Sequence, residues 1–162
     1  MFKRSIFFIV IVILLGFQSQ AQMQTGGNLG VNINNNILTI DFAPEFSYSF
    51  IENTSLGISP FVIYSHDLQT SISEFLVGGR VFGEYKTDFG VFAHAEFEAT
   101  KPYTNEGYQK TIYAAPLGGG FESELSNNMV AYIMVLCDML YKKDISLRQN
   151  PIVRAGIRYS IN

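Results

Sequence analysis

Alternation of apolar and polar residues in the segment 89–100, FGVFAHAEFEAT, constrains the fold of this chain more than any other feature. One set of alternate positions is apolar throughout, namely Phe89, Val91, Ala93, Ala95, Phe97 and Ala99. The other set is mostly polar or charged and includes His94, Glu96 and Glu98. A period of two is that of a β-strand, whose successive side chains point to opposite faces. The segment therefore predicts a strand with one apolar and one polar face.

The same pattern recurs along the chain, with turn-forming residues between the segments. We predict strands at 27–34, 37–50, 55–65, 74–86, 89–100, 110–124, 129–142 and 151–162. Pro44, Pro60 and Pro116 fall inside these segments, where a regular strand tolerates proline only at a bulge or bend. A tilted membrane strand needs about 9–11 residues, which most of these segments supply. The pattern predicts an all-β fold, an eight-stranded antiparallel up-and-down barrel that crosses a membrane.

The amino-terminal residues have the features of an export signal. Lys3 and Arg4 precede the apolar run 6–17, and Ser19-Gln20-Ala21 fits a small-x-small cleavage site. The run is too short for a spanning helix, which needs about 20 apolar residues. We predict a cleaved signal peptide at 1–21 and a barrel domain at 22–162.

Composition excludes several classes of protein. Apolar residues make up 48% of the 162 residues and charged residues 15%, which argues against disorder. The net charge is −3 and the chain has no basic run, so we expect no nucleic-acid partner. The single cysteine, Cys137, excludes an intramolecular disulfide framework.

Loop lengths and aromatic positions favour a membrane barrel over a soluble one. The polar loops 66–73, 101–109 and 143–150 alternate with very short turns, as expected for outer loops and periplasmic turns. Outward aromatic residues fall near the strand ends, where aromatic girdles meet the two lipid interfaces. This predicted girdle comprises Phe50, Tyr64, Phe75, Tyr85, Phe89, Tyr113, Phe121, Tyr141 and Tyr159.

The strand pattern and the carboxyl-terminal GIRYSIN resemble the small eight-stranded outer-membrane barrels of the OmpA/OmpX type, particularly the outer membrane protein beta-barrel family of Bacteroidetes. The family usually ends in an aromatic residue, whereas this chain ends in Ile161-Asn162. The resemblance implies a monomer in the outer membrane of a Gram-negative bacterium. It also implies contact with outer-membrane lipid, and with the barrel-assembly machinery during biogenesis.

Inward-facing charged residues are the candidate site. In our reading they are Glu45, Arg80, Glu84, His94, Glu96, Glu122, Asp138, Arg154 and Arg158. Side chains fill the interior of an eight-stranded barrel, so these charges must be paired or protonated. They would form a plug of salt bridges and hydrogen bonds or line a narrow porin-like path. A tight hairpin at Thr87-Asp88 would set Arg80 opposite His94 or Glu96, with Arg80–Glu96 as the central ion pair.

Three functions remain open from the sequence. We expect a non-enzymatic outer-membrane barrel that acts in envelope integrity or surface interaction through its outer loops. One alternative is a lipid-A-modifying enzyme. For this role His66, between Ser65 and Asp67, is a better candidate than His94, which faces the lumen in the predicted barrel. The other is a soluble, lipocalin-like ligand-binding barrel. Two histidines are few for a zinc site, so we expect no metal and no cofactor.

Overall fold

A computed structural model describes residues 22–34, 36–104, 107–108, 110–142, 146 and 148–161. The predicted signal peptide, 1–21, lies outside the described residues. No helix in the described part of the chain is long and apolar enough to cross a membrane.

Ten strands follow one another along the described residues. They are β1 (Gln22–Asn34), β2 (Ile37–Ile51), β3 (Thr54–Asp67), β4 (Ser73–Lys86), β5 (Val91–Thr104), β6 (Gly107–Tyr108), β7 (Ile112–Ala114), β8 (Pro116–Ser126), β9 (Met129–Asp138) and β10 (Ile152–Ile161).

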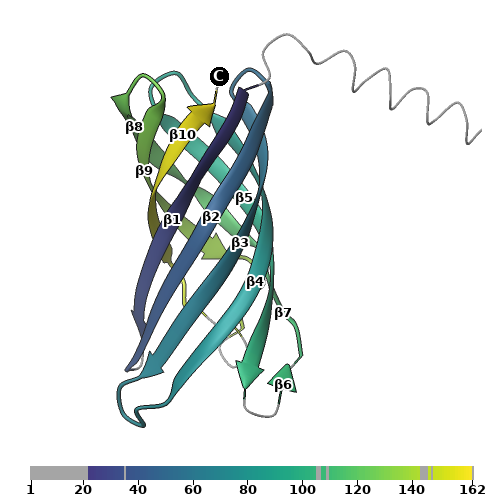
Figure 1. Cartoon of the computed structure of the whole chain (residues 1–162), viewed down its shortest axis with the longest axis vertical. Coiled ribbons are helices and arrows are strands. Elements are labelled where there is room, and N and C mark those ends of the chain that lie inside the picture. Colours follow the sequence, from purple (N-terminus) through teal and green to yellow (C-terminus); the bar gives the residue numbers. More distant parts are fainter. Residues whose placement is uncertain are drawn as a thin grey trace, which may run out of the picture.

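The strands close into a barrel (Figure 1). β1 to β5 pair in succession, β5 pairs with β8, β8 with β9, β9 with β10 and β10 with β1, all antiparallel, so the sheet closes on itself. β7 and β8 pair with β5 in one continuous register on either side of Ala115, so together they form the sixth strand. β6 is a two-residue strand that pairs antiparallel with the last two residues of β5. The predicted eight-stranded antiparallel barrel is therefore confirmed.

The two ends of the barrel differ (Figure 1). Both chain ends of the barrel and the short β2–β3, β4–β5 and β8–β9 turns lie at one end, which we call the terminal end. The β1–β2 turn and the longer β3–β4, β5–β7 and β9–β10 connections lie at the other, which we call the loop end. The alternation of short turns and longer connections follows the sequence prediction, with the β1–β2 turn again the short exception.

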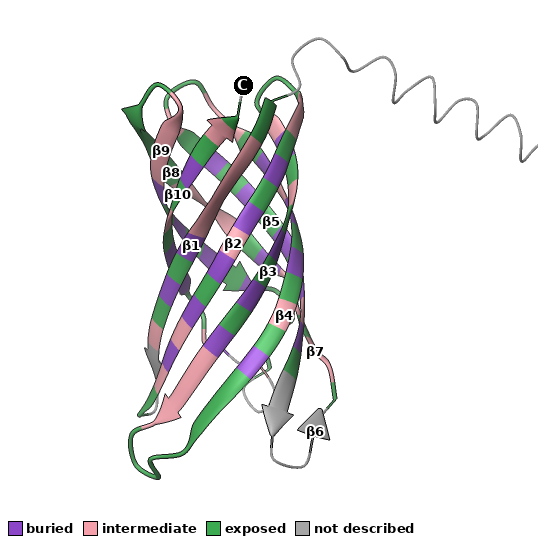
Figure 2. Cartoon of the chain, in the orientation of Figure 1, coloured by how far each residue is buried: buried purple, intermediate pink, exposed green. Residues whose placement is uncertain are grey.

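Burial alternates along the strands as the sequence pattern predicts (Figure 2). In β5 the side chain of Phe97 is 48% exposed on the outer face, whereas His94 is 1% exposed inside. The interior also holds two apolar clusters, one of Phe92, Tyr132, Met134, Leu136 and Ile152 and one of Ala43, Phe61, Ile63 and Leu76. The lumen is thus filled by apolar and charged side chains together.

The prolines lie within strands without shifting the register. Pairing of β2 with β3 keeps one register on both sides of Pro44 and Pro60, which places the two prolines opposite each other. Neither proline has a backbone N–H to donate. Because the two prolines face each other, the missing hydrogen bonds fall at one position of the β2–β3 pairing. Pro116 begins β8, and the neighbouring Ala115 donates its N–H to Asp138 Oδ1 at 2.9 Å.

Three strand boundaries differ from the sequence prediction by four residues or more, and part of the aromatic placement differs too. β1 begins at Gln22, β5 runs on to Thr104, and β9 ends at Asp138, so Tyr141 lies beyond the strand and is half-buried. Phe50 lies at a register shift between Ser49 and Ile51 and is half-buried, as is Tyr64. The other predicted girdle residues are exposed, namely Phe75, Tyr85, Phe89, Tyr113, Phe121 and Tyr159.

The predicted register of the β4–β5 hairpin is wrong. The last strand pair is Lys86 with Phe92, and the turn between them is closed by hydrogen bonds from the Thr87 N–H to the Val91 carbonyl and from the Gly90 N–H to the Thr87 carbonyl. Gly90 has φ of 83°, a left-handed conformation that glycine adopts without strain. This longer turn moves the partner of Arg80 two residues beyond Glu96 and four beyond His94, so Arg80 stands opposite Glu98.

We predict that Gly90→Ala destabilises the barrel and that Gly79→Ala does not. A Cβ at Gly90 would be strained at its positive φ and would lie 2.6 Å from the Glu122 carbonyl oxygen, whereas a Cβ at Gly79 meets nothing within 4 Å. Urea unfolding in detergent micelles should show a loss of about 1–3 kcal/mol for Gly90→Ala. Equal effects of the two substitutions would contradict this account of the turn.

Candidate functional site

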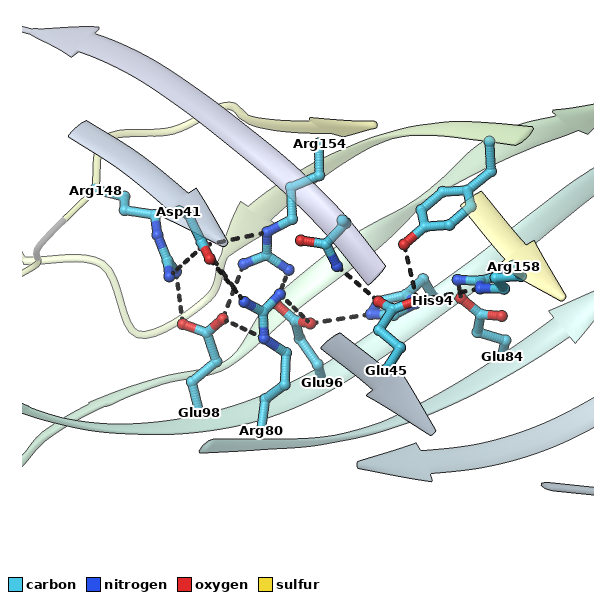
Figure 3. Close-up of polar contacts among 12 residues, drawn as sticks. Asp41, Glu45, Arg80, Glu84, His94, Glu96, Glu98, Arg148, Arg154 and Arg158 are labelled. Atoms are coloured by element: carbon cyan, nitrogen blue, oxygen red, sulfur yellow. Dashed lines mark hydrogen bonds and ion pairs between the residues drawn. The ribbon is translucent and has the colours of Figure 1, made fainter. Parts of the chain in front are cut away.

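Ten ionisable side chains meet inside the barrel in what we call the lumen network (Figure 3). β2, β4, β5 and β10 supply all of them except Arg148, which comes from the β9–β10 connection. None is more than 8% exposed. The members are Asp41, Glu45, Arg80, Glu84, His94, Glu96, Glu98, Arg148, Arg154 and Arg158.

The half of the network nearer the loop end contains three arginines and three carboxylates. Arg154 donates to Glu96 Oε1 at 2.7 Å and to Glu98 Oε1 at 2.8 Å. Arg148 donates from Nη1 to Glu98 Oε2 at 2.6 Å and from Nη2 to Asp41 Oδ2 at 2.8 Å. Arg80 donates to Asp41 at 3.2 Å, and its Nε lies 3.4 Å from Glu98 Oε1. Arg148 and Arg80 therefore join carboxylates of β2 and β5, and Arg154, which bonds two carboxylates of β5, has its Nε 3.8 Å from Asp41 Oδ2 on β2.

The half nearer the terminal end is built around Arg158. This side chain donates from Nη2 to Glu84 Oε1 at 2.6 Å and from Nε to Glu45 Oε2 at 3.2 Å. Glu45 also accepts from Asn28 Nδ2 at 2.7 Å and from the Tyr132 hydroxyl at 2.8 Å. In the described part of the chain, Glu45 has a single arginine partner, and these neutral donors supply its remaining hydrogen bonds. A buried carboxylate needs such bonds because it is cut off from water.

His94 connects the two halves (Figure 3). Its Nδ1 lies 2.8 Å from Glu84 Oε1 and its Nε2 lies 3.1 Å from Glu96 Oε2. Carboxylates only accept hydrogen bonds, so a ring that bonds both of them donates from both nitrogens and is an imidazolium. The ring also stacks on Phe82, with the centroids 5.3 Å apart.

The charges of each half then cancel. Nearer the loop end, Asp41, Glu96 and Glu98 face Arg80, Arg148 and Arg154. Nearer the terminal end, Glu45 and Glu84 face Arg158 and the imidazolium of His94. A buried ion pair is tolerated only when charges are matched and remaining donors and acceptors are bonded, so this matching is the condition for burying ten such groups.

Aromatic rings cover the faces of three guanidiniums. The Arg158 Cζ atom lies 4.0 Å from the Tyr132 centroid and 5.6 Å from that of Phe92. Arg80 and Arg148 lie over Phe61, at 4.7 Å and 5.5 Å. Cation–π contacts of this kind strengthen where water is excluded. They couple the charged and the apolar parts of the interior.

Two residues of the predicted site lie at its margins. Glu122 is near the terminal end, where Lys86 Nζ donates to it at 2.9 Å and Arg158 Nη1 lies 3.8 Å away. Asp138 has no ion pair recorded among the described residues; its Oδ1 accepts from the backbone N–H groups of Ala115 and Leu140, both at 2.9 Å. Asp138 therefore holds the backbone at the loop end in place and takes no part in the charge balance of the network.

Three members of the network were missing from the predicted set. Asp41 and Glu98 occupy inward positions of predicted strands, so the alternation already contained the signal for them. Arg148 lies in a loop, where no period reveals the direction of a side chain. The predicted Arg80–Glu96 pair is a contact of 3.7 Å without a recorded hydrogen bond, and Arg154 is the main partner of Glu96.

The histidine considered for an enzyme site has different neighbours. His66 Nδ1 lies 2.9 Å from the Ser73 hydroxyl, which also bonds the Tyr64 hydroxyl at 3.0 Å. Asp67 Oδ1 instead accepts from the backbone N–H groups of Gln69 and Thr70. Across the described residues, no group of three or more histidine, cysteine or acidic side chains is arranged to hold a metal ion.

We predict stronger energetic coupling for Arg154–Glu96 than for Arg80–Glu96. Each single change to leucine should cost about 3–5 kcal/mol because it leaves a buried charge unpaired. The double mutant Arg154→Leu/Glu96→Leu should lose less than the sum, by about 0.5–3 kcal/mol, in urea unfolding in micelles. The Arg80→Leu/Glu96→Leu cycle is the control, because Glu96 changes in both. A larger coupling in the control would refute the observed hydrogen-bond pattern.

No family model matches the chain, and no curated protein matches it. Among solved structures, a de novo designed transmembrane β-barrel is 16% identical with a TM-score of 0.45, covering 89% of this chain and 98% of its own. The designed barrel TMB2.3 is 20% identical with a TM-score of 0.47, covering 90% and 98%. Ail, the attachment invasion locus protein of Yersinia pestis, is 10% identical with a TM-score of 0.42, covering 86% and 94%. The chain is similar to these proteins in fold alone.

Proposed function

We propose that this chain is an integral outer-membrane β-barrel with a lumen closed by ion pairs. It acts without catalysis, in envelope integrity or in surface interaction through the connections at its loop end. The observation that carries the proposal is the distribution of side chains: the barrel presents apolar side chains to its surroundings and holds the ten charged groups of the lumen network inside.

The outer wall supports a lipid environment. Large apolar side chains are exposed on every strand of the barrel wall; one from each long strand is Leu29, Phe42, Ile58, Val81, Phe97, Leu117, Ile133 and Ile157. The exposed charged residues lie toward the two ends: Glu52, Asp88 and Glu124 at the terminal end, and Glu74, Lys101, Lys110 and Lys142 at the loop end. Water-soluble proteins rarely expose apolar surface so continuously, whereas a membrane barrel requires it.

The packed interior supports a closed barrel rather than a porin-like path. The side chains of Arg80 and Arg154 are fully buried where they cross the lumen. At the loop end, the cavities on either side of Arg148 are only about 20 and 10 Å³. A polar vestibule of about 380 Å³ enters from the terminal end and is lined by Lys86 and Glu122. An ion entering there meets the Arg158 half of the network.

The loop end supports an interaction role. Leu68 and Ile72 in the β3–β4 connection are 55% and 60% exposed, and Met139 after β9 is 66% exposed. In the orientation that the sequence predicts, these residues face outside the cell. Apolar side chains on polar connections are typical of surfaces that contact a partner.

The neighbours of His66 support a non-enzymatic role over the lipid-modifying alternative. A serine–histidine hydrolase needs a third group that orients the histidine. In the described part of the chain, the hydrogen bond recorded for His66 goes to Ser73, and the nearby Asp67 caps a turn. The lipocalin-like alternative would place the apolar faces inward around a ligand, opposite to the observed arrangement.

We predict that Val81→Arg destabilises the barrel in lipid vesicles and that Gln69→Arg does not. Val81 lies in the middle of β4 with its side chain 56% exposed, whereas Gln69 is exposed in the β3–β4 connection. An arginine facing lipid near the membrane midplane costs about 2–4 kcal/mol, and one outside the lipid costs about 0–1 kcal/mol. The measurement is urea unfolding of both variants and the wild type in the same vesicles.

The soluble alternative gives a different result in this experiment. A surface valine that faces water can be changed with an effect within about 0.5 kcal/mol. Equal stability of Val81→Arg and Gln69→Arg, in a protein that stays folded without detergent or lipid, would overturn the proposed function.

A further inference from the structure

We propose that Asp41, Glu98 and Phe61 form a guanidinium-binding site at the loop end of the lumen, and that Arg148 occupies this site as an internal ligand. A guanidinium group from solution would bind there when Arg148 is absent. The proposal depends only on the geometry of the loop end and is independent of whether the outer wall meets lipid.

The contacts of Arg148 define the chemistry of the site. Its Nη1 and Nη2 donate to carboxylates on two different strands, Glu98 on β5 at 2.6 Å and Asp41 on β2 at 2.8 Å. The Phe61 ring lies 5.5 Å from its Cζ. A planar fork of donors matches two separated carboxylates and stacks on a ring, which a compact ammonium group cannot do equally well. The site therefore selects a guanidinium.

The charge of the surrounding cluster also favours a cation at this position. With Arg148 in place, the three carboxylates of Asp41, Glu96 and Glu98 face three guanidiniums. Without it, Arg80 and Arg154 leave one buried negative charge uncompensated. Asp41 and Glu98 are 3% and 1% exposed, so water compensates this charge poorly.

Arg148 differs from the other arginines because no strand holds it. Its backbone lies in the β9–β10 connection, which is anchored separately by Asn150: the Asp138 N–H donates to Asn150 Oδ1 at 2.7 Å, and Asn150 Nδ2 donates to the Asp138 carbonyl at 3.1 Å. The carboxylates are fixed on β2 and β5. Truncation of Arg148 therefore leaves the walls of the site in place.

Small spaces already flank the internal ligand. One cavity of about 20 Å³ touches Arg148 and Glu98, and another of about 10 Å³ touches Arg148 and Asp41. Arg148 Nε is buried and makes no hydrogen bond among the described residues, so the site holds its ligand by the two terminal nitrogens alone. Removing the side chain would join the two cavities into a space on both carboxylates.

The test is chemical rescue of Arg148→Ala in the micelles or vesicles in which the protein folds. The variant should be less stable than the wild type, and guanidinium at low concentration should raise its unfolding midpoint in a saturable way. At ten times the dissociation constant, the ratio of folded to unfolded protein should rise about elevenfold. Sodium chloride at equal ionic strength, and methylammonium, should give a smaller rise, and the wild type should gain nothing.

A second variant separates the site from general charge effects. In Arg148→Ala/Asp41→Asn the uncompensated charge is removed, so guanidinium should no longer stabilise the protein. N-acetyl-arginine amide tests whether the side chain of a peptide can enter as well; rescue by free guanidinium alone would limit the ligand to small compounds.

The proposal is overturned if guanidinium stabilises Arg148→Ala no more than it stabilises the wild type, or if the double variant responds equally. If Arg148→Ala does not fold without guanidinium, the test compares the fraction of folded protein recovered with and without guanidinium. No gain in folded protein would again reject the site.

Discussion

Matched charge inside a closed sheet is the constraint on which the rest of this structure depends. Ten ionisable groups, none more than 8% exposed, sit in the lumen, and leaving one of them unpaired would cost about 3–5 kcal/mol. The barrel satisfies this condition in two halves that are each neutral, joined by His94 between Glu84 and Glu96. The carboxylates of the loop-end half stand on β2 and β5 and those of the other half on β2 and β4, so the ion pairs also tie the wall together across the lumen (Figure 3).

Apolar packing and charge pairing share this interior and depend on each other. Phe61 lies against Arg80 and Arg148, and Tyr132 both covers Arg158 and donates to Glu45. Glycine makes room for such rings, because a Cβ at Gly78 would collide with Phe61 and one at Gly57 with Phe82. Rings, guanidiniums and carboxylates thus fill one space, which supports a barrel that is closed rather than conducting.

The sequence was sufficient for the architecture because a strand has a period of two. The alternation in 89–100 placed His94 and Glu96 inside and Phe97 outside, and the structure has them there. The sequence prediction was wrong where a turn is longer, or a strand shorter, than the alternation alone indicates. The turn closed by Gly90 is longer than a tight hairpin, so Arg80 faces Glu98 rather than His94 or Glu96. The ladder of β9 ends at Asp138, which left Tyr141 outside the strand.

The candidate site could be predicted only in part for the same reason. Inward positions of strands can be read from their parity, and Asp41 and Glu98 were available to that reasoning. Arg148 was not, because its direction depends on how a connection folds over the loop end. Nor does parity tell which carboxylate pairs with which arginine, since that depends on the tilt of the strands around the barrel and on side-chain reach.

The protonation of His94 tests the central claim of matched charge most directly. The measurement is a two-dimensional ¹⁵N–¹H correlation of the imidazole rings in the folded protein at neutral pH, with His66→Gln to assign the second of the two histidines. The account predicts that both ring nitrogens of His94 carry hydrogen. A neutral ring with one bare nitrogen would contradict it, because the half of the network around Arg158 would then hold an excess negative charge.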